Sequence, residues 1–262
     1  MNIVVLVKQV PAISDVNLDP VTHNLVRSGA PAMMNPVDLH AVEAALALKE
    51  EAGGGTVTII TMGSDSAAEI MRSAIALGAD NGYLINDGPI KGSDTLATAK
   101  VLAKSIAKVG NVDVVFTGKK STDGDTGQIP PAVAQHLGMN LLSYVDKLSL
   151  ADGKLKAVRK NNKGVEAVEA DLPCVVSVME TMNTPRTPGI KSKMNAKKIV
   201  FPIWTLADIN LSPSQVGAEG SGTKVTELFS PAPHEQGVVV TGADEVEAVS
   251  KLAKLLRDKK VI

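Results

Sequence analysis

The fold is decided by the loop Gly118-Lys-Lys-Ser-Thr-Asp-Gly-Asp-Thr-Gly-Gln128 and by the two segments that flank it. Before the loop, the apolar run Val112–Phe116 is typical of a buried strand. After it, Ile129–Leu137 predicts a helix with prolines in its first turn, where a missing N–H does least harm. A strand, a glycine-rich loop and a helix N-terminus together indicate an anion site, because N–H groups there can face negative charge.

Taken alone, this loop has two interpretations. One is a cradle for a nucleotide phosphate, in which Thr126 and Gln128 add neutral donors. The other is an ordinary strand-to-helix connection that is rich in turn residues because it turns. The loop has neither the three spaced glycines of the dinucleotide fingerprint nor the Gly-Lys-Ser/Thr ending of a P-loop.

Strands and helices alternate from residue 3 to residue 137. Apolar runs predict buried strands at Ile3–Val7, Thr56–Met62 and Gly82–Asn86, in addition to 112–116. Helices are expected after Asn35-Pro36, from Ala67 and after residues 92–95. This pattern predicts an α/β fold with a doubly wound, mostly parallel sheet, Rossmann-like and nucleotide α-hydrolase-like, with an added antiparallel hairpin and a C-terminal arm.

The loops that follow the strands converge on one sheet edge. Residues 8–11, 62–66, 92–95 and 118–128 all fall at the carboxyl ends of parallel strands, where open α/β sheets bind ligands. Their convergence favours the nucleotide interpretation. Lys8, at the end of the first strand, could meet a phosphate there or could equally be a solvated lysine at a strand end. A non-redox binding module similar to the universal stress proteins stays open as an alternative, from which residues 140–262 would distinguish this chain.

The second half of the chain changes pattern. Antiparallel strands are expected at 141–150, 154–159 and 165–170, followed by a buried strand at 173–178. Residues 183–198 are basic and stiffened by proline, which indicates either an exposed docking loop or a solvated surface loop. We expect one nucleotide-binding domain at 1–200. Residues 201–262 would form an arm, closed by an amphipathic helix over 244–260 that packs on a partner subunit. Two turn segments, 17–20 and 27–29, suggest a short hairpin excursion.

Composition excludes several functions. The 262 residues are 44% hydrophobic with a net charge of −1, which gives no electrostatic case for nucleic acid or an anionic membrane. No apolar run is long enough for membrane insertion, and the N-terminus lacks a signal peptide, so we expect a cytoplasmic protein. The single cysteine, Cys174, lies in a strand-like run and predicts a buried, inert thiol. The four histidines are widely spaced, so no metal site is expected.

Several motifs, in order, resemble the β subunit of electron-transfer flavoproteins, including the nitrogen-fixation-linked homologues and most of all the electron-bifurcating members of anaerobes. The resemblance covers nearly the whole chain. Its motifs are Val7-Lys8, Met34-Asn-Pro36, Ile60-Thr-Met-Gly63, Leu77-Gly-Ala-Asp80, the 118–128 loop, Leu172-Pro-Cys-Val-Val176, Asn183-Thr-Pro-Arg186 and Met194-Asn-Ala-Lys-Lys198.

The resemblance implies a heterodimer with a larger α subunit that carries a mobile FAD domain. It also implies a nucleotide in this chain, which is structural AMP in respiratory members. In bifurcating members it is FAD that takes a hydride from NADH and divides the electrons between ferredoxin and an acyl-CoA dehydrogenase or reductase. The loops at 92–98 and 118–128 look more like the bifurcating group. The flavin would carry the chemistry, and no side chain is expected to act as general acid, general base or nucleophile.

The resemblance and the loops together yield two sets of predicted residues. The cofactor-binding set is Leu6, Lys8, Asn35, Pro36, Met62, Gly63, Asp94, Thr95, Thr98, Gly118, Asp123, Gly124, Asp125, Thr126, Gly127 and Gln128. The partner-docking set is Asn183, Pro185, Arg186, Ile190, Lys191 and Met194, with Ile190 as the apolar anchor and lysines on the rim.

Overall fold

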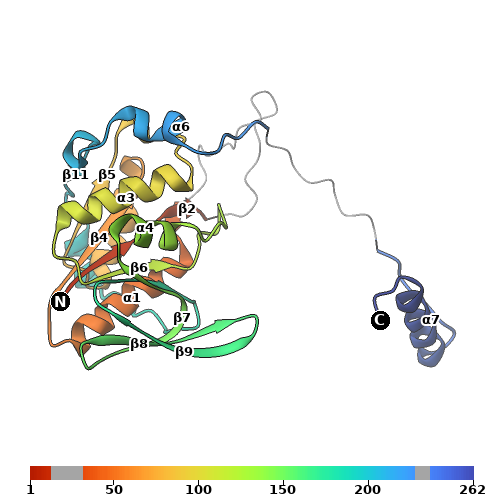
Figure 1. Cartoon of the computed structure of the whole chain (residues 1–262). Coiled ribbons are helices and arrows are strands. Elements are labelled where there is room, and N and C mark those ends of the chain that lie inside the picture. Colours follow the sequence, from red (N-terminus) through yellow and green to blue (C-terminus); the bar gives the residue numbers. More distant parts are fainter. Residues whose placement is uncertain (13–31, 228–236) are drawn as a thin grey trace. The chain divides into compact units, whose positions relative to one another are not determined.

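The computed structural model describes residues 1–12, 32–227 and 237–262 (Figure 1). The chain divides into two compact units, Met1–Thr226 and Glu227–Ile262. The turn segments expected at 17–20 and 27–29 lie outside the described residues.

The first unit is built on a nine-stranded sheet in the order β11-β5-β4-β1-β6-β10-β7-β8-β9. All neighbours from β11 to β7 are parallel, whereas β7, β8 and β9 form an antiparallel meander at one end. A two-stranded antiparallel sheet of β2 and β3 follows the end of β1. The strands are β1 Asn2–Leu6, β2 Gln9–Pro11, β3 Ala32–Met34, β4 Thr56–Met62, β5 Asn81–Ile85, β6 Val114–Gly118, β7 Asn140–Ala151, β8 Lys154–Asn161, β9 Gly164–Asp171, β10 Cys174–Val178 and β11 Ile203–Trp204.

Helices cover both faces of the sheet, which confirms the doubly wound prediction. In β1, Ile3 and Val5 pack in the core under α1 (Pro36–Glu51) and α2 (Ala68–Leu77), whereas Val4 and Leu6 pack in the core under the opposite layer. That layer contains α3 (Thr95–Val109) and α4 (Ile129–Leu137). Because alternate side chains of a strand point to opposite faces, a continuous apolar run is what a strand covered on both faces requires.

Several predicted bounds agree with the structure. The strand predicted at residues 56–62 and the helix predicted at residues 129–137 have the observed bounds, and the antiparallel strands after residue 140 are present. The fourth strand was predicted at residues 112–116 but lies at Val114–Gly118, so its C-terminal end carries the first glycine of the loop. The basic segment at residues 183–198 is not loop throughout, because α5 forms at Ile190–Ala196.

The segment at residues 201–226 belongs to the first unit. Its strand β11 pairs in parallel with β5 at the sheet edge, and Trp204 stacks on Tyr83 with ring centroids 3.9 Å apart. The Lys108 ammonium lies 4.9 Å from the Trp204 ring centroid. Short helical turns η3 (Ala207–Ile209) and η4 (Pro213–Gln215) and the helix α6 (Gly217–Gly220) continue the segment. Consequently the compact unit extends to residue 226, beyond the boundary expected at residue 200.

The second unit contains α7, Glu245–Asp258, close to the amphipathic helix predicted at 244–260. Asp244 caps it by accepting a hydrogen bond from the Glu247 N–H at 2.8 Å. Val246, Val249 and Leu252 on its apolar face are exposed. No helix in the described ranges 1–12, 32–227 and 237–262 is long and apolar enough to cross a membrane.

Candidate functional site

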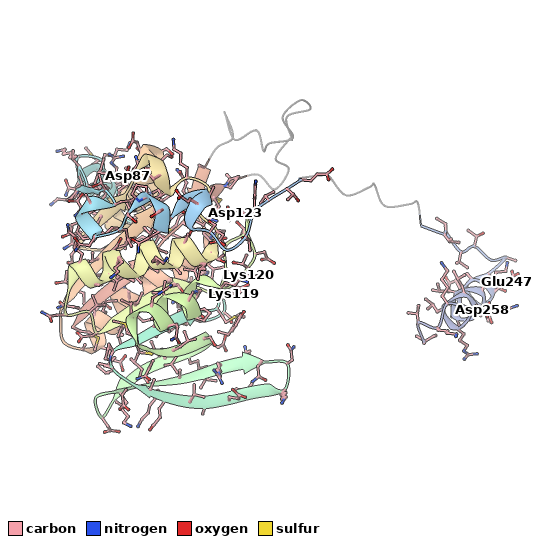
Figure 2. The ribbon with its side chains drawn as sticks, turned by 45° about the horizontal axis from the view of Figure 1, so that its top comes forward. Asp87, Lys119, Lys120, Asp123, Glu247 and Asp258 are labelled. Carbon is pink, nitrogen blue, oxygen red and sulfur yellow. The ribbon has the colours of Figure 1, made fainter. Side chains whose placement is uncertain are left out.

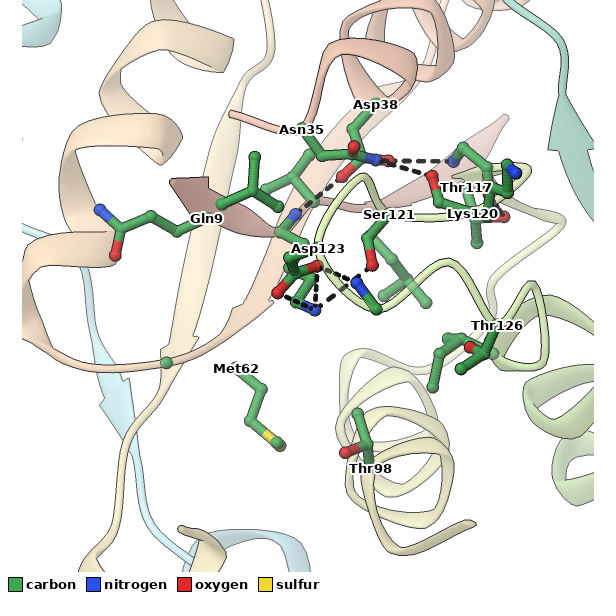
Figure 3. A pocket seen from close by; sticks show the side chains of 18 of the residues that line it. Gln9, Asn35, Asp38, Met62, Thr98, Thr117, Lys120, Ser121, Asp123 and Thr126 are labelled. Atoms are coloured by element: carbon green, nitrogen blue, oxygen red, sulfur yellow. Dashed lines mark hydrogen bonds and ion pairs between the residues drawn. The ribbon is translucent and has the colours of Figure 1, made fainter. Parts of the chain in front are cut away.

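A cavity of about 810 Å³ lies at the carboxyl edge of the parallel sheet (Figure 3). It opens between the ends of β1, β4 and β6 and the first turns of α3 and α4, so residues far apart in the sequence share its wall. This is the switch point of the strand order, since the chain passes from β1 to β4 on one side and to β6 on the other. Doubly wound sheets bind ligands at this position.

Most of the predicted cofactor-binding residues line this cavity. The exceptions are Pro36, Asp125 and Gln128, which are not among the lining residues. Gln128 instead accepts a hydrogen bond from the Thr95 hydroxyl at 2.6 Å, and Asp125 pairs with Lys120 at 2.6 Å. The lining members are Leu6, Lys8, Asn35, Met62, Gly63, Asp94, Thr95, Thr98, Gly118, Asp123, Gly124, Thr126 and Gly127.

A buried carboxylate, Asp38, joins the elements that form the cavity. Only 5% of it is exposed. It accepts hydrogen bonds from the Lys8 N–H at 2.8 Å, the Asn35 amide at 2.8 Å and the Gly118 N–H at 3.2 Å. Burial raises the pKa of Asp38 to about 7, although these hydrogen bonds favour the charged form. Asp38 therefore holds the ends of β1 and β6 against the first turn of α1.

Asn35 extends this network into the loop, where Figure 3 shows it beside Asp38. Asn35 stands at the N-cap position of α1, but its side chain makes no cap hydrogen bond. Instead the Asn35 amide donates to the Lys120 carbonyl at 3.1 Å, and its oxygen accepts from the Thr122 N–H at 3.3 Å. The side chain thus fixes the course of the loop.

Gly118 is needed where β6 passes the start of α1. A Cβ at this position would lie 2.4 Å from Asp38 Oδ1 and 3.1 Å from the Val37 Cβ. Both distances are too short for ordinary carbon contacts, and neither neighbour is the free end of a flexible chain. The glycine therefore serves close packing, and it brings the loop backbone within reach of Asp38.

Lys8, the candidate phosphate contact, forms an ion pair within the chain. Lys8 Nζ lies 2.7 Å from Asp123 Oδ1 and 3.3 Å from Ser121 Oγ. Burial opposes a low pKa at Asp123, but hydrogen bonds from Lys8 and Ser121 hold the pKa of that carboxyl below its usual value. The side chains of Lys119, Lys120 and Asp123 lie near one another at the edge of the first unit (Figure 2). The loop is thus a network of internal pairs rather than a patch of one charge.

The start of α4 offers few backbone donors. Pro130 and Pro131 follow Ile129, so the first turn carries a single N–H. The neutral polar groups that line the cavity are mostly hydroxyl side chains on the surrounding loops and helix starts. They are Ser64, Ser66, Ser93, Thr95, Thr98, Ser121 and Thr126. Three of these hydroxyls already donate within the chain, Ser66 to Gln9, Ser93 to the Ile90 carbonyl and Thr95 to Gln128.

Sequence patterns missed several lining residues. Asp38 stands in the first turn of a helix, where an acidic residue is already favoured by the helix dipole and gives no separate signal. Ser64 and Ser66 fall in the predicted 62–66 loop, so their place in that loop could have identified them. Among the described residues, no group of three His, Cys, Asp or Glu side chains is arranged to hold a metal ion.

The predicted partner-docking residues form two groups. Asn183 and Arg186 pin the segment to α1: Asn183 donates to the His40 carbonyl at 3.0 Å, and Arg186 Nε lies 2.8 Å from Glu43 Oε2. Beyond them α5 presents Ile190, which is 81% exposed, and Met194, which is also exposed. In the same segment, Pro185 is half-buried and Lys191 is exposed. The structure therefore separates an anchored start from a helix that exposes two apolar side chains, Ile190 and Met194.

Comparison with known proteins gives a consistent family. The family model described as electron transfer flavoprotein domain matches residues 22–209. The caffeyl-CoA reductase-Etf complex subunit CarD of Acetobacterium woodii is 38% identical over 262 residues, covering 100% of both chains. The electron transfer flavoprotein subunit beta of Thermoanaerobacterium thermosaccharolyticum is 40% identical, again over 100% of both chains. Protein FixA of Azorhizobium caulinodans is 37% identical over 98% of this chain and 94% of its own.

Proposed function

The chain belongs to the electron transfer flavoprotein family, as a β subunit, and from this premise we propose that it binds FAD in the switch-point cavity. In the proposed complex, electrons from NADH are divided between ferredoxin and an acyl-CoA dehydrogenase or reductase. The second flavin is carried by an α subunit. The proposal places this complex in the cytoplasm.

The size of the cavity is the observation that favours FAD over AMP as its ligand. At about 810 Å³ it is near the upper end of the roughly 300–1,000 Å³ range of ligand pockets. AMP is only one of the two nucleotide parts of FAD and would leave much of such a cavity unfilled. Hydroxyls of Thr95, Thr98 and Thr126 suit a pyrophosphate and a ribityl chain, while Leu6 and Met62 offer apolar surface for a ring.

The flavin, when bound, supplies the hydride and one-electron chemistry. The chain's own residues orient the ligand and set the charge around it. Lys8 and Asp123, which both line the cavity, neutralise each other at 2.7 Å. A rearrangement of that pair would release one positive charge toward a phosphate or a reduced ring.

Two surfaces fit the proposed partners. The exposed apolar face of α7 suits the α subunit, because a helix with such a face needs a covering surface. The exposed Ile190 and Met194 on α5, with Lys191 and Lys193 beside them, suit a dehydrogenase: an apolar anchor with a charged rim. The relative from Acetobacterium woodii is named as part of a caffeyl-CoA reductase complex, which supports a partner of the acyl-CoA reductase type.

The competing proposal is a non-bifurcating subunit that holds structural AMP while the α subunit alone carries electrons. Acid release of ligands from the purified heterodimer, with FAD and AMP quantified, separates the two. We expect two FAD per heterodimer. One FAD with one AMP would overturn the proposal and leave this chain as a structural holder.

A further inference from the structure

We propose that Ser221 and Thr223 are positioning residues for the nucleotide cavity and act on it through Asp94. The inference rests on the proposed function, because it concerns how tightly the cavity holds its nucleotide. Neither residue lines the cavity. They come from the segment that ends the first unit, more than one hundred residues beyond Asp94 in the sequence.

Asp94 is held from two sides. Its Oδ1 caps α3 by accepting from the Ala97 N–H at 2.9 Å. Its Oδ2 accepts from the Thr223 N–H at 2.9 Å and from the Thr223 hydroxyl at 3.1 Å, while its own N–H donates to Ser221 Oγ at 2.8 Å. Burial opposes a low pKa at Asp94, but the hydrogen bonds from Ala97 and Thr223 hold the pKa of the carboxyl below its usual value. The side chain therefore stays charged and keeps both oxygens as acceptors.

A second contact brings the same two segments together. The Gly217 N–H donates to Ser93 Oγ at 2.9 Å, and the Ser93 hydroxyl donates to the Ile90 carbonyl at 2.7 Å. Gly217 has φ +63°, and a Cβ there would lie 2.1 Å from the Pro89 carbonyl oxygen. Only glycine allows this approach. The contact between residues 217–223 and the loop at 88–94, which we term the clasp, is thus closely fitted.

The clasp acts on the rim of the cavity. Ser93, Asp94, Thr95 and Thr98 all line it. Ser93 and Asp94 belong to the loop that the clasp holds, and Thr95 and Thr98 lie in the first turn of α3, which Asp94 caps. The clasp thereby fixes where the Thr95 and Thr98 hydroxyls stand before a nucleotide arrives, which reduces the ordering cost of binding. By linkage, a nucleotide that binds the ordered rim also stabilises the clasp.

The test compares the heterodimer carrying Ser221→Ala with Thr223→Val against wild type and against Ser214→Ala. Ser214 lies in the same segment, and its hydroxyl is exposed and bonded to Ser212. Binding of FAD and of AMP is measured by titration calorimetry after ligand removal. Hydrogen–deuterium exchange of residues 217–223 is followed in the wild type with and without FAD.

We expect the double variant to bind FAD roughly tenfold more weakly, because two hydrogen bonds that involve the Asp94 turn are lost. Ser214→Ala should bind as the wild type does, and FAD should slow exchange at residues 217–223. Unchanged affinity in the double variant, or unchanged exchange in the wild type, would contradict the proposed positioning role of Ser221 and Thr223. If the wild-type heterodimer binds only AMP, the FAD proposal fails but the positioning role does not, and the double variant is then compared with the wild type in its affinity for AMP. If the wild type binds neither nucleotide, both proposals fail.

Discussion

Gly118→Ala should damage the cavity without any change of charge. The added Cβ would meet Asp38 Oδ1 at 2.4 Å and the Val37 backbone carbon at 3.2 Å. Gly118 does not have a positive φ, so any effect arises from this collision rather than from backbone conformation. Relief requires β6 to move away from α1, which breaks the hydrogen bond from the Gly118 N–H to Asp38.

Two effects determine how much stability Gly118→Ala loses. Overpacking of a close-packed site costs about 1–3 kcal/mol. Loss of the hydrogen bond to the Asp38 carboxyl costs about 1.5 kcal/mol, between the values for neutral and charged acceptors, because the pKa of Asp38 is about 7 and the bond is 3.2 Å long. Together they predict about 3 kcal/mol of lost stability. For a chain of this size that corresponds to a fall of roughly 6–12 °C in Tm.

The assay is urea unfolding of the heterodimer, followed by circular dichroism, with FAD content measured on the same samples. Gly124→Ala is the matched control, because a Cβ there meets only Ser121 Oγ at 3.5 Å and Lys8 Nζ at 3.9 Å. The control should lose less than about 0.5 kcal/mol. If Gly118→Ala lost no more stability than this control, the assignment of Gly118 to close packing at Asp38 would be wrong.

Three further predictions concern single side chains. Burial raises the pKa of Asp38 from 3.8 to about 7, so the folded state holds the Asp38 proton more tightly than the unfolded state does. The resulting contribution to the free energy of unfolding is complete below pH 3.8 and is lost as the pH rises through about 7. Unfolding free energy should therefore fall by about 3 kcal/mol from pH 5 to pH 8, and Asp38→Asn should flatten that slope; a slope that the variant retains would exclude Asp38 as its source. Ile190→Ala should leave Tm within about 1 °C, since Ile190 is 81% exposed, yet slow electron transfer to the dehydrogenase severalfold; an unchanged rate would exclude α5 as the docking element. Burial also raises the pKa of Cys174 to about 11, so a thiol reagent at about pH 8 should label it only after unfolding, and rapid labelling of the native chain would contradict that.

The alternating layers of the fold could be predicted because their signals are local. Thr56–Met62 is a continuous run of β-branched and apolar residues, and Ile129–Leu137 carries prolines where a helix tolerates them, so both bounds were predicted correctly. Strand β11 could not be predicted in the same way. It has only two residues, and what makes it a strand is the neighbouring edge of β5 rather than any periodicity of its own.

The candidate cavity was predictable in outline but not in its internal connections. Loops that follow parallel strands must meet at one edge, which predicts that Lys8, Thr95 and Gly118 lie together. The hydrogen bonds of Asp38 and the clasp on Asp94 join residues that include pairs 30 and 129 positions apart. A single sequence carries no period or spacing that would indicate such long-range partners.

Trp204 gives the edge of the sheet its own optical probe. It is the only tryptophan in the chain, and it stacks on Tyr83 beside the Lys108 ammonium. Its emission therefore depends on whether β11 remains attached to β5, and the rest of the chain adds no competing signal of that kind. Tryptophan fluorescence can therefore follow detachment of the 203–226 segment separately from unfolding of the central sheet, without labelling or any added residue.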